Sequence, residues 1–153
     1  MTTKPGRRDW LYLPLLLYCA VMLWLLFFRS PGRIEGLSYP QQLRQNINIA
    51  PFYTIRNYIH VLLNSSNGTL VRHCFINLVG NVIMFIPAGY LLTRLWKSQR
   101  NFFVFLLTCT ALILLVELLQ LLTLLGSFDV DDLILNLSGM FLGYLLCIIS
   151  RPK

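Results

Sequence analysis

Residues 117–143 read ELLQLLTLLGSFDVDDLILNLSGMFLG, and this stretch decides the interpretation of the whole chain. An apolar run that carries Glu117 breaks near Gly126, passes through an acidic turn and continues as a second apolar run. Three of the six carboxylates of the chain lie in the turn, at Asp129, Asp131 and Asp132. Because acidic groups in or beside a membrane span are costly, they mark a candidate functional site by default.

The composition around this stretch is that of an integral membrane protein. Of the 153 residues, 56% are hydrophobic and only 12% are charged, with a mean hydropathy of +0.64. A soluble domain of this length has no core large enough to hide such runs, so we expect one all-α membrane domain over residues 1–153. The net charge of +7 comes with no nucleic-acid-binding motif. It indicates basic residues that flank spans and meet anionic lipid, with no nucleic acid as a partner.

The apolar runs predict four transmembrane helices, at residues 10–28, 73–96, 102–125 and 133–149. Residues 29–72 form the long segment between the first two. Within this segment, residues 54–64 place apolar side chains on one helical face, which predicts an extracytoplasmic amphipathic or re-entrant helix at the membrane surface. An ordinary packed loop helix is the alternative.

Basic residues predict the orientation. Eight of them are concentrated in short segments on one side of the predicted spans: Lys4, Arg7, Arg8, Arg94, Lys97, Arg100, Arg151 and Lys153. The positive-inside rule then predicts a multi-pass protein of the bacterial plasma membrane with both termini in the cytoplasm.

The polar residues of the predicted spans fall into one layer near the outer surface. Glu117 and Gln120 share a helical face, as do Asn77 and Asn81. After the turn, polar and glycine positions recur every three or four residues and form one face: Asp129, Asp132, Asn136, Gly139 and Gly143. The glycines predict a close approach of another helix. The amides are candidates for either interhelical hydrogen bonds or ligand contacts.

Several carboxylates in one layer need compensation by protonation, a divalent cation or arginines. The segment 29–72 on the same side supplies three candidate arginines, Arg29, Arg44 and Arg72. A site of carboxylates, amides and arginines suits a lipid or amphiphile with an anionic, hydrogen-bonding headgroup. A purely structural ion-pair network is the alternative.

Four short pieces of the chain carry a family resemblance: NINIAPF at 46–52, NVIMFIPAGYLL at 81–92, VELLQ at 116–120 and DVDDLILNLSGMFLG at 129–143. On these pieces the chain resembles the VanZ-like membrane proteins. The resemblance implies a protein of the bacterial cell envelope, linked to reduced action of lipid-tailed glycopeptides such as teicoplanin. It supplies no reaction. Asp131 is not part of the pattern and is interpreted as an incidental surface acid.

The positions that match the VanZ-like pattern, together with the polar layer, give the candidate site residues. Those expected to bind a ligand are Asn48, Asn81, Glu117, Gln120, Asp129, Asp132 and Asn136, with Arg29, Arg44 and Arg72. Those expected to act structurally are Pro51, Phe52, Phe85, Pro87, Gly89, Gly139 and Gly143.

Three functions are compatible with these residues. The first is an envelope protein without enzyme activity that binds a membrane lipid, a lipid-linked cell-wall precursor or a lipoglycopeptide at the outer leaflet. The second is an enzyme acting on a lipid headgroup, in which Asp129 and Asp132 hold a divalent cation; no other cofactor is expected. The third is a structural partner subunit, whose polar residues serve helix packing.

Overall fold

The computed structural model describes residues 9–27 and 36–150, which form six α-helices, two 3-10 helices and two short strands. The α-helices are α1 (Tyr12–Phe27), α2 (Tyr39–Gln45), α3 (Tyr53–Asn64), α4 (Gly68–Leu95), α5 (Phe102–Thr123) and α6 (Val130–Ile149). The 3-10 helices are η1 (Asp9–Leu11) and η2 (Ser98–Arg100), and the strands are β1 (Ile47–Asn48) and β2 (Phe128–Asp129). Arg29 lies outside the described residues, as do the last residue of the predicted first span and the basic residues near both ends of the chain.

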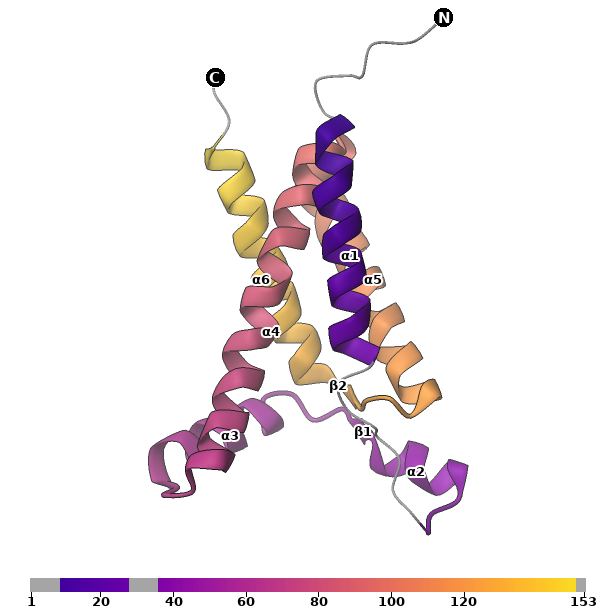
Figure 1. Cartoon of the computed structure of the whole chain (residues 1–153), viewed down its shortest axis with the longest axis vertical. Coiled ribbons are helices and arrows are strands. Elements are labelled where there is room, and N and C mark those ends of the chain that lie inside the picture. The colour runs from indigo at the N-terminus through magenta and orange to yellow at the C-terminus, as the bar shows by residue number, and fades with distance from the viewer. Residues whose placement is uncertain (1–8, 28–35, 151–153) are drawn as a thin grey trace, which may run out of the picture.

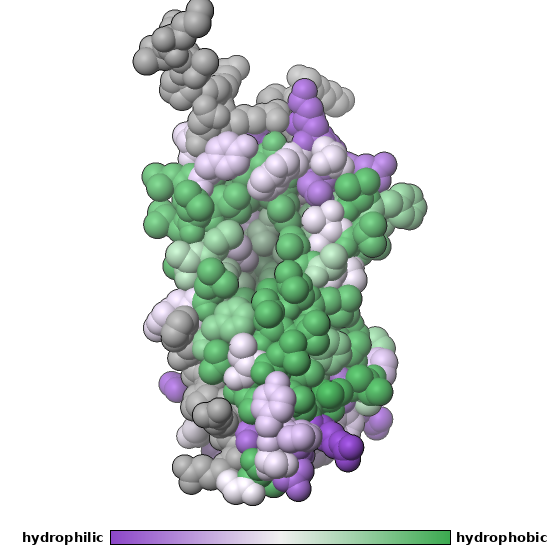
Figure 2. Space-filling view, turned by 90° about the vertical axis from the view of Figure 1, so that its right-hand side faces the viewer, coloured by the Kyte–Doolittle hydropathy of each residue, from purple (hydrophilic) through white to green (hydrophobic). Residues whose placement is uncertain are grey.

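Four helices, α1, α4, α5 and α6, run along the long axis, and α2, α3 and both strands gather at one end (Figure 1). The start of α1 and the end of α6 lie at the opposite end. Three helices, α4, α5 and α6, are long and apolar enough to cross a membrane, and α1 is a shorter apolar helix. Figure 2 shows a broad hydrophobic band across the middle of one face, with hydrophilic residues towards both ends. The fold is that of an all-helical membrane protein, while the number of crossings stays a prediction.

Helix α4 begins earlier than the hydropathy pattern predicts. Its start is fixed by Asn67, whose side-chain oxygen accepts hydrogen bonds from the backbone N–H groups of Thr69 and Leu70. Such N-caps satisfy backbone donors that have no partner inside the helix. Arg72 therefore lies inside α4, and the predicted boundary between the 29–72 segment and the second span falls within this helix.

Glycines bring α4 and α6 into direct backbone contact. A Cβ atom added to Gly139 would lie 2.1 Å from the carbonyl oxygen of Val82, and one added to Gly143 would lie 2.1 Å from that of Ile86. From the other side, a Cβ at Gly89 would lie 1.9 Å from the carbonyl oxygen of Met140. The predicted close approach at Gly139 and Gly143 is thus confirmed, and α4 is the partner helix.

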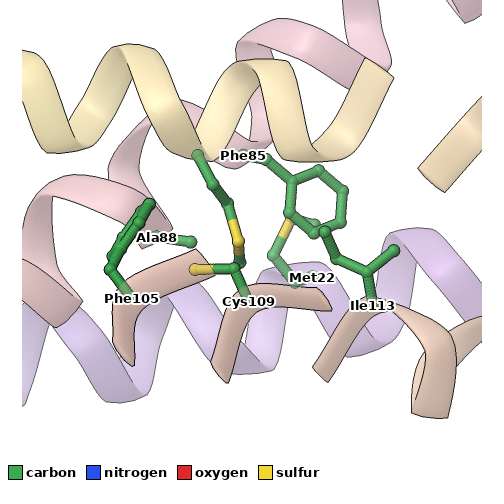
Figure 3. Close-up of a cluster of buried hydrophobic side chains, with 7 residues drawn as sticks. Met22, Phe85, Ala88, Phe105, Cys109 and Ile113 are labelled. Carbon is green, nitrogen blue, oxygen red and sulfur yellow. The ribbon is translucent and has the colours of Figure 1, made fainter. Parts of the chain in front are cut away.

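The hydrophobic core lies between the four long-axis helices (Figure 3). Its buried members are Met22 of α1, Phe85 and Ala88 of α4, Phe105, Cys109 and Ile113 of α5, and Met140 of α6. Because Phe85 is buried in this cluster, its predicted structural role is supported by packing. Pro87 lies inside α4, where it offers no backbone N–H to the helix.

A two-residue parallel ladder was not predicted from the helical periodicity. β1 pairs with β2, so that Ile47 is opposite Phe128 and Asn48 is opposite Asp129. The backbone N–H of Phe128 also donates to the carbonyl oxygen of Asn46 at 2.8 Å. This ladder holds the start of the NINIAPF segment against the acidic turn.

Candidate functional site

Asp131 is fully buried, so its interpretation as an incidental surface acid is wrong. Its Oδ1 accepts a hydrogen bond from the backbone N–H of Phe52, and its Oδ2 accepts one from that of Ile55 at 3.0 Å. These N–H groups belong to the start of α3, whose N-cap residue Phe52 adopts a left-handed conformation with φ 63° and supplies no side-chain cap. Asp131 of α6 thus caps α3 from another part of the chain.

Asp129 and Asn48 hold the same junction together. The Asp129 carboxylate accepts hydrogen bonds from Asn48 Nδ2 at 3.2 Å, from Thr54 Oγ1 at 2.6 Å and from the backbone N–H of Asp131 at 2.8 Å. The last of these bonds caps α6. Both oxygens of Asp129 are therefore used by the protein itself. Asn48 and Asp129, both expected to bind a ligand, form a structural network between β1, α3 and α6.

Tyr58 of α3 lies half-buried near this network. Burial raises the pKa of its phenol above the usual value, and the nearby Asp132, Cys74 and Asp129 raise it further. Its ring also makes an edge-on contact with His73, with ring centroids 6.3 Å apart. Ionisation of Tyr58 beside the carboxylates is therefore less favourable than that of an ordinary phenol.

Next to this network lies a polar cavity of about 330 Å³, within the range of roughly 300–1,000 Å³ typical of ligand pockets. Its walls come from α1, α4, α5, α6 and the turn after α5. The polar lining residues are His73, Asn77, Asn81, Glu117, Gln120, Ser127, Asp132 and Asn136, and the others are Leu25, Leu26, Met84, Leu125 and Gly126. Asn81, Glu117, Gln120, Asp132 and Asn136, all candidate ligand-binding residues, are thus brought together.

Glu117 occupies the most enclosed acidic position of this cavity. Its side chain is 3% exposed, and its Oε2 accepts a hydrogen bond from the backbone N–H of Asp129 at 3.3 Å. Asp132, on the first turn of α6, accepts a hydrogen bond from Asn81 Nδ2 at 2.6 Å. The two carboxylates therefore face one cavity from α5 and α6, and each accepts a hydrogen bond from one donor among the described residues.

The candidate arginines do not line this cavity. Arg44 is exposed on α2 and Arg72 is exposed on α4, and within residues 9–27 and 36–150 neither pairs with a carboxylate. Compensation of the buried carboxylates by these two arginines is therefore not observed. Arg29 falls outside the described ranges.

The two carboxylates predicted to hold a divalent cation, Asp129 and Asp132, lie in different environments. Asp132 faces the cavity, whereas Asp129 does not line it and bonds to β1 and α3. In the part of the chain that the structure describes, no group of three or more His, Cys, Asp or Glu side chains is arranged to hold a metal ion. The geometry thus gives no support to a metal-assisted reaction at these two residues.

Comparison with known proteins decides the family. A model of the VanZ/LLP1 family matches residues 15–151, almost the whole chain. The chain belongs to the VanZ/LLP1 family. Among curated proteins, it is 30% identical over 133 residues to Protein VanZ of Enterococcus faecium, covering 84% of this chain and 68% of that protein. No solved structure matches.

VanZ/LLP1 membership confirms the resemblance drawn from the four short sequence pieces. Two features of the site were nevertheless missed: the capping role of Asp131 and the contribution of α1 through Leu25 and Leu26. The sequence does contain one signal for the first. APFYT at 50–54 starts an amphipathic helix without Ser, Thr, Asp or Asn before its first turn, so a cap from elsewhere is required.

Proposed function

We propose that this VanZ/LLP1 protein binds an amphiphile at the membrane surface, with the headgroup in the polar cavity and one hydrocarbon chain along α1. The observation that carries the proposal is an apolar groove of about 320 Å³ that shares a lining residue, Leu26, with the polar cavity. An amphiphile requires this pairing of a polar and an apolar compartment.

The chemistry of the groove supports a hydrocarbon occupant. On the α1 side it is lined by Tyr18, Met22 and Leu26, and on the opposite side by residues that include Phe85 and Ile113. Almost all of its exposed lining is apolar. Because the chain of a membrane amphiphile already lies in hydrocarbon, the groove adds packing contacts for that chain rather than a gain from leaving water. The polar cavity alone offers no such stabilisation.

The biological role follows from the ligand class and from the family. We propose that the polar end faces the outer leaflet of the bacterial plasma membrane, with both chain termini in the cytoplasm. Support for this orientation comes from Arg94 in the last turn of α4, Lys97 at the N-cap of η2 and Arg100 in η2, all at the opposite end from α3. Binding a lipid-linked precursor or the lipid-tailed glycopeptide itself would lower the action of that antibiotic at the outer leaflet.

A larger side chain at Leu26, the residue shared by the groove and the cavity, tests whether the groove binds a hydrocarbon chain. The probe is a lysophospholipid that carries a photoreactive diazirine at the end of its acyl chain. Leu26→Trp should lower the labelling of the protein about tenfold, because an overpacking cost of about 1.4 kcal/mol corresponds to that factor. In the wild type, peptide mass spectrometry should find the label at groove residues such as Met22 and Ile113.

Leu16→Trp is the matched control, because Leu16 is an exposed leucine of the same helix that lines neither the cavity nor the groove. It should leave labelling unchanged. Labelling spread evenly over the exposed faces of α1 and α5, and equal in both variants, would contradict the proposed function.

A further inference from the structure

Three of the four amide side chains that line the polar cavity donate a hydrogen bond within the described protein. Asn77 Nδ2 donates to the carbonyl oxygen of His73 at 2.9 Å, and Gln120 Nε2 donates to that of Leu26 at 2.8 Å. Asn81 Nδ2 donates to the carboxylate of Asp132. Because carbonyl and carboxylate oxygens only accept, these partners fix the orientation of each amide. Each of these three amides keeps an acceptor oxygen that the described protein does not use, beside the second N–H of its NH₂ group.

The side-chain oxygen of Asn136 independently indicates that a hydrogen-bond donor is missing. Its side chain is 4% exposed and lines the cavity, and its Oδ1 is buried without a hydrogen-bond partner among the described residues. A buried acceptor left without a partner costs roughly 1–3 kcal/mol. This oxygen has almost no accessible surface, so the amide must turn towards the cavity before a ligand donor can satisfy it and remove that cost.

Among the described residues, the charged groups that line the cavity are mostly acidic. Its lining contains the carboxylates of Glu117 and Asp132 and the imidazole of His73, and no Lys or Arg side chain among the described residues. An anionic headgroup here would face two carboxylates in a partly desolvated site. A cationic headgroup would compensate them and form charge-assisted hydrogen bonds.

We propose that the headgroup bound in this cavity carries a primary ammonium group, which donates hydrogen bonds to Glu117, Asp132 and Asn136. This inference rests on the proposed function and names the ligand class of the same site. A primary ammonium has three N–H donors and no acceptor, which matches a cavity of unfilled acceptors and two carboxylates. The sign is opposite to that of the anionic headgroup expected from the arginines of the sequence.

The test compares three headgroups on one chain length, with the full-length protein in phosphatidylcholine nanodiscs. The probes are dodecylamine, which has charge and donors, dodecyltrimethylammonium, which has charge without donors, and dodecyl phosphate, which is anionic. Titration calorimetry against empty nanodiscs should find saturable binding of dodecylamine, at least about tenfold tighter than that of either other probe.

Substitutions then test whether the preference for a primary ammonium headgroup arises in the cavity. Glu117→Gln keeps an acceptor for the Asp129 N–H but removes the charge, and it should weaken dodecylamine binding by about tenfold. Arg72→Gln, an exposed residue of α4 outside the cavity, should leave it unchanged. The comparison of probes on the wild type does not depend on how well either variant folds.

Other outcomes overturn the inference in distinguishable ways. Dodecyl phosphate binding as tightly as dodecylamine, and weakened by Arg72→Gln, would establish an anionic headgroup and leave the proposed function standing. Equal affinity for dodecylamine and dodecyltrimethylammonium would show that no hydrogen bond is donated. Absence of saturable binding by all three probes, together with no groove labelling in the lysophospholipid experiment, would overturn the proposed function as well.

Discussion

Gly143→Ala should prevent α6 from packing on α4 and lower the stability of the purified protein by about 3 kcal/mol or more. The added Cβ would lie 2.1 Å from the carbonyl oxygen of Ile86 and 2.7 Å from the backbone nitrogen of Tyr90. Both neighbours are backbone atoms, so no side-chain rotation relieves the overlap and the two helices must separate. Thermal unfolding followed by the yield of monodisperse protein in detergent measures the loss.

Gly80→Ala is the matched control on α4. The nearest atom to a Cβ at Gly80 is Ile76 Cγ2, at 3.9 Å, which is an ordinary contact. Because alanine is a better helix former than glycine by about 1 kcal/mol, this variant should be as stable as the wild type or more stable. Equal unfolding temperatures for Gly143→Ala and the wild type would contradict the α4–α6 contact.

Asp131→Ala should release the start of α3 from α6. The substitution leaves the N–H groups of Phe52 and Ile55 without their acceptor, and the loss of such a helix cap costs roughly 0.5–2 kcal/mol. Hydrogen–deuterium exchange of the peptide covering residues 50–58 should become faster by about tenfold, since about 1.4 kcal/mol of lost protection corresponds to that factor.

Asp132→Asn serves as the control for this prediction, since Asp132 is the next residue on α6 and makes no hydrogen bond to α3. The exchange of residues 50–58 should change little in this variant. Unchanged exchange in Asp131→Ala would show that the buried carboxylate does not cap α3.

The sequence predicts the long helices well, because their apolar runs are long and carry few polar residues. Three of the four predicted spans correspond to long apolar helices, and the first corresponds to the shorter α1. The amphipathic segment at 54–64 is helical, as α3. The start of α4 differs because hydropathy gives no weight to the capping oxygen of Asn67, which extends the helix back to Gly68.

The site was predictable where its residues recur at helical spacing. Glu117 and Gln120 on α5, and Asp132 and Asn136 on α6, each lie one turn apart and face the same cavity. The roles of Asp129 and Asn48 were not predictable, because they depend on a two-residue ladder between segments about 80 residues apart. No local periodicity encodes such a pairing.

Charge compensation was the least predictable feature. Arg44 and Arg72 are close in sequence to the polar layer, but whether an arginine faces a cavity depends on the helix face that it occupies. Both are exposed and outside the cavity. The excess of hydrogen-bond acceptors in the cavity near Glu117 can be recognised only once the hydrogen-bond partners of the Asn and Gln side chains are known.

The measurement that tests the central claim most directly is native mass spectrometry of wild type and Asn136→Leu, combined with thermal unfolding. If Asn136 accepts a hydrogen bond from a bound headgroup, the wild type should carry a discrete amphiphile that Asn136→Leu lacks. Because leucine replaces an unpartnered buried amide, the ligand-free variant should be at least as stable as the delipidated wild type. Bare wild-type protein, or the same adduct on both proteins, would contradict a ligand site at this cavity.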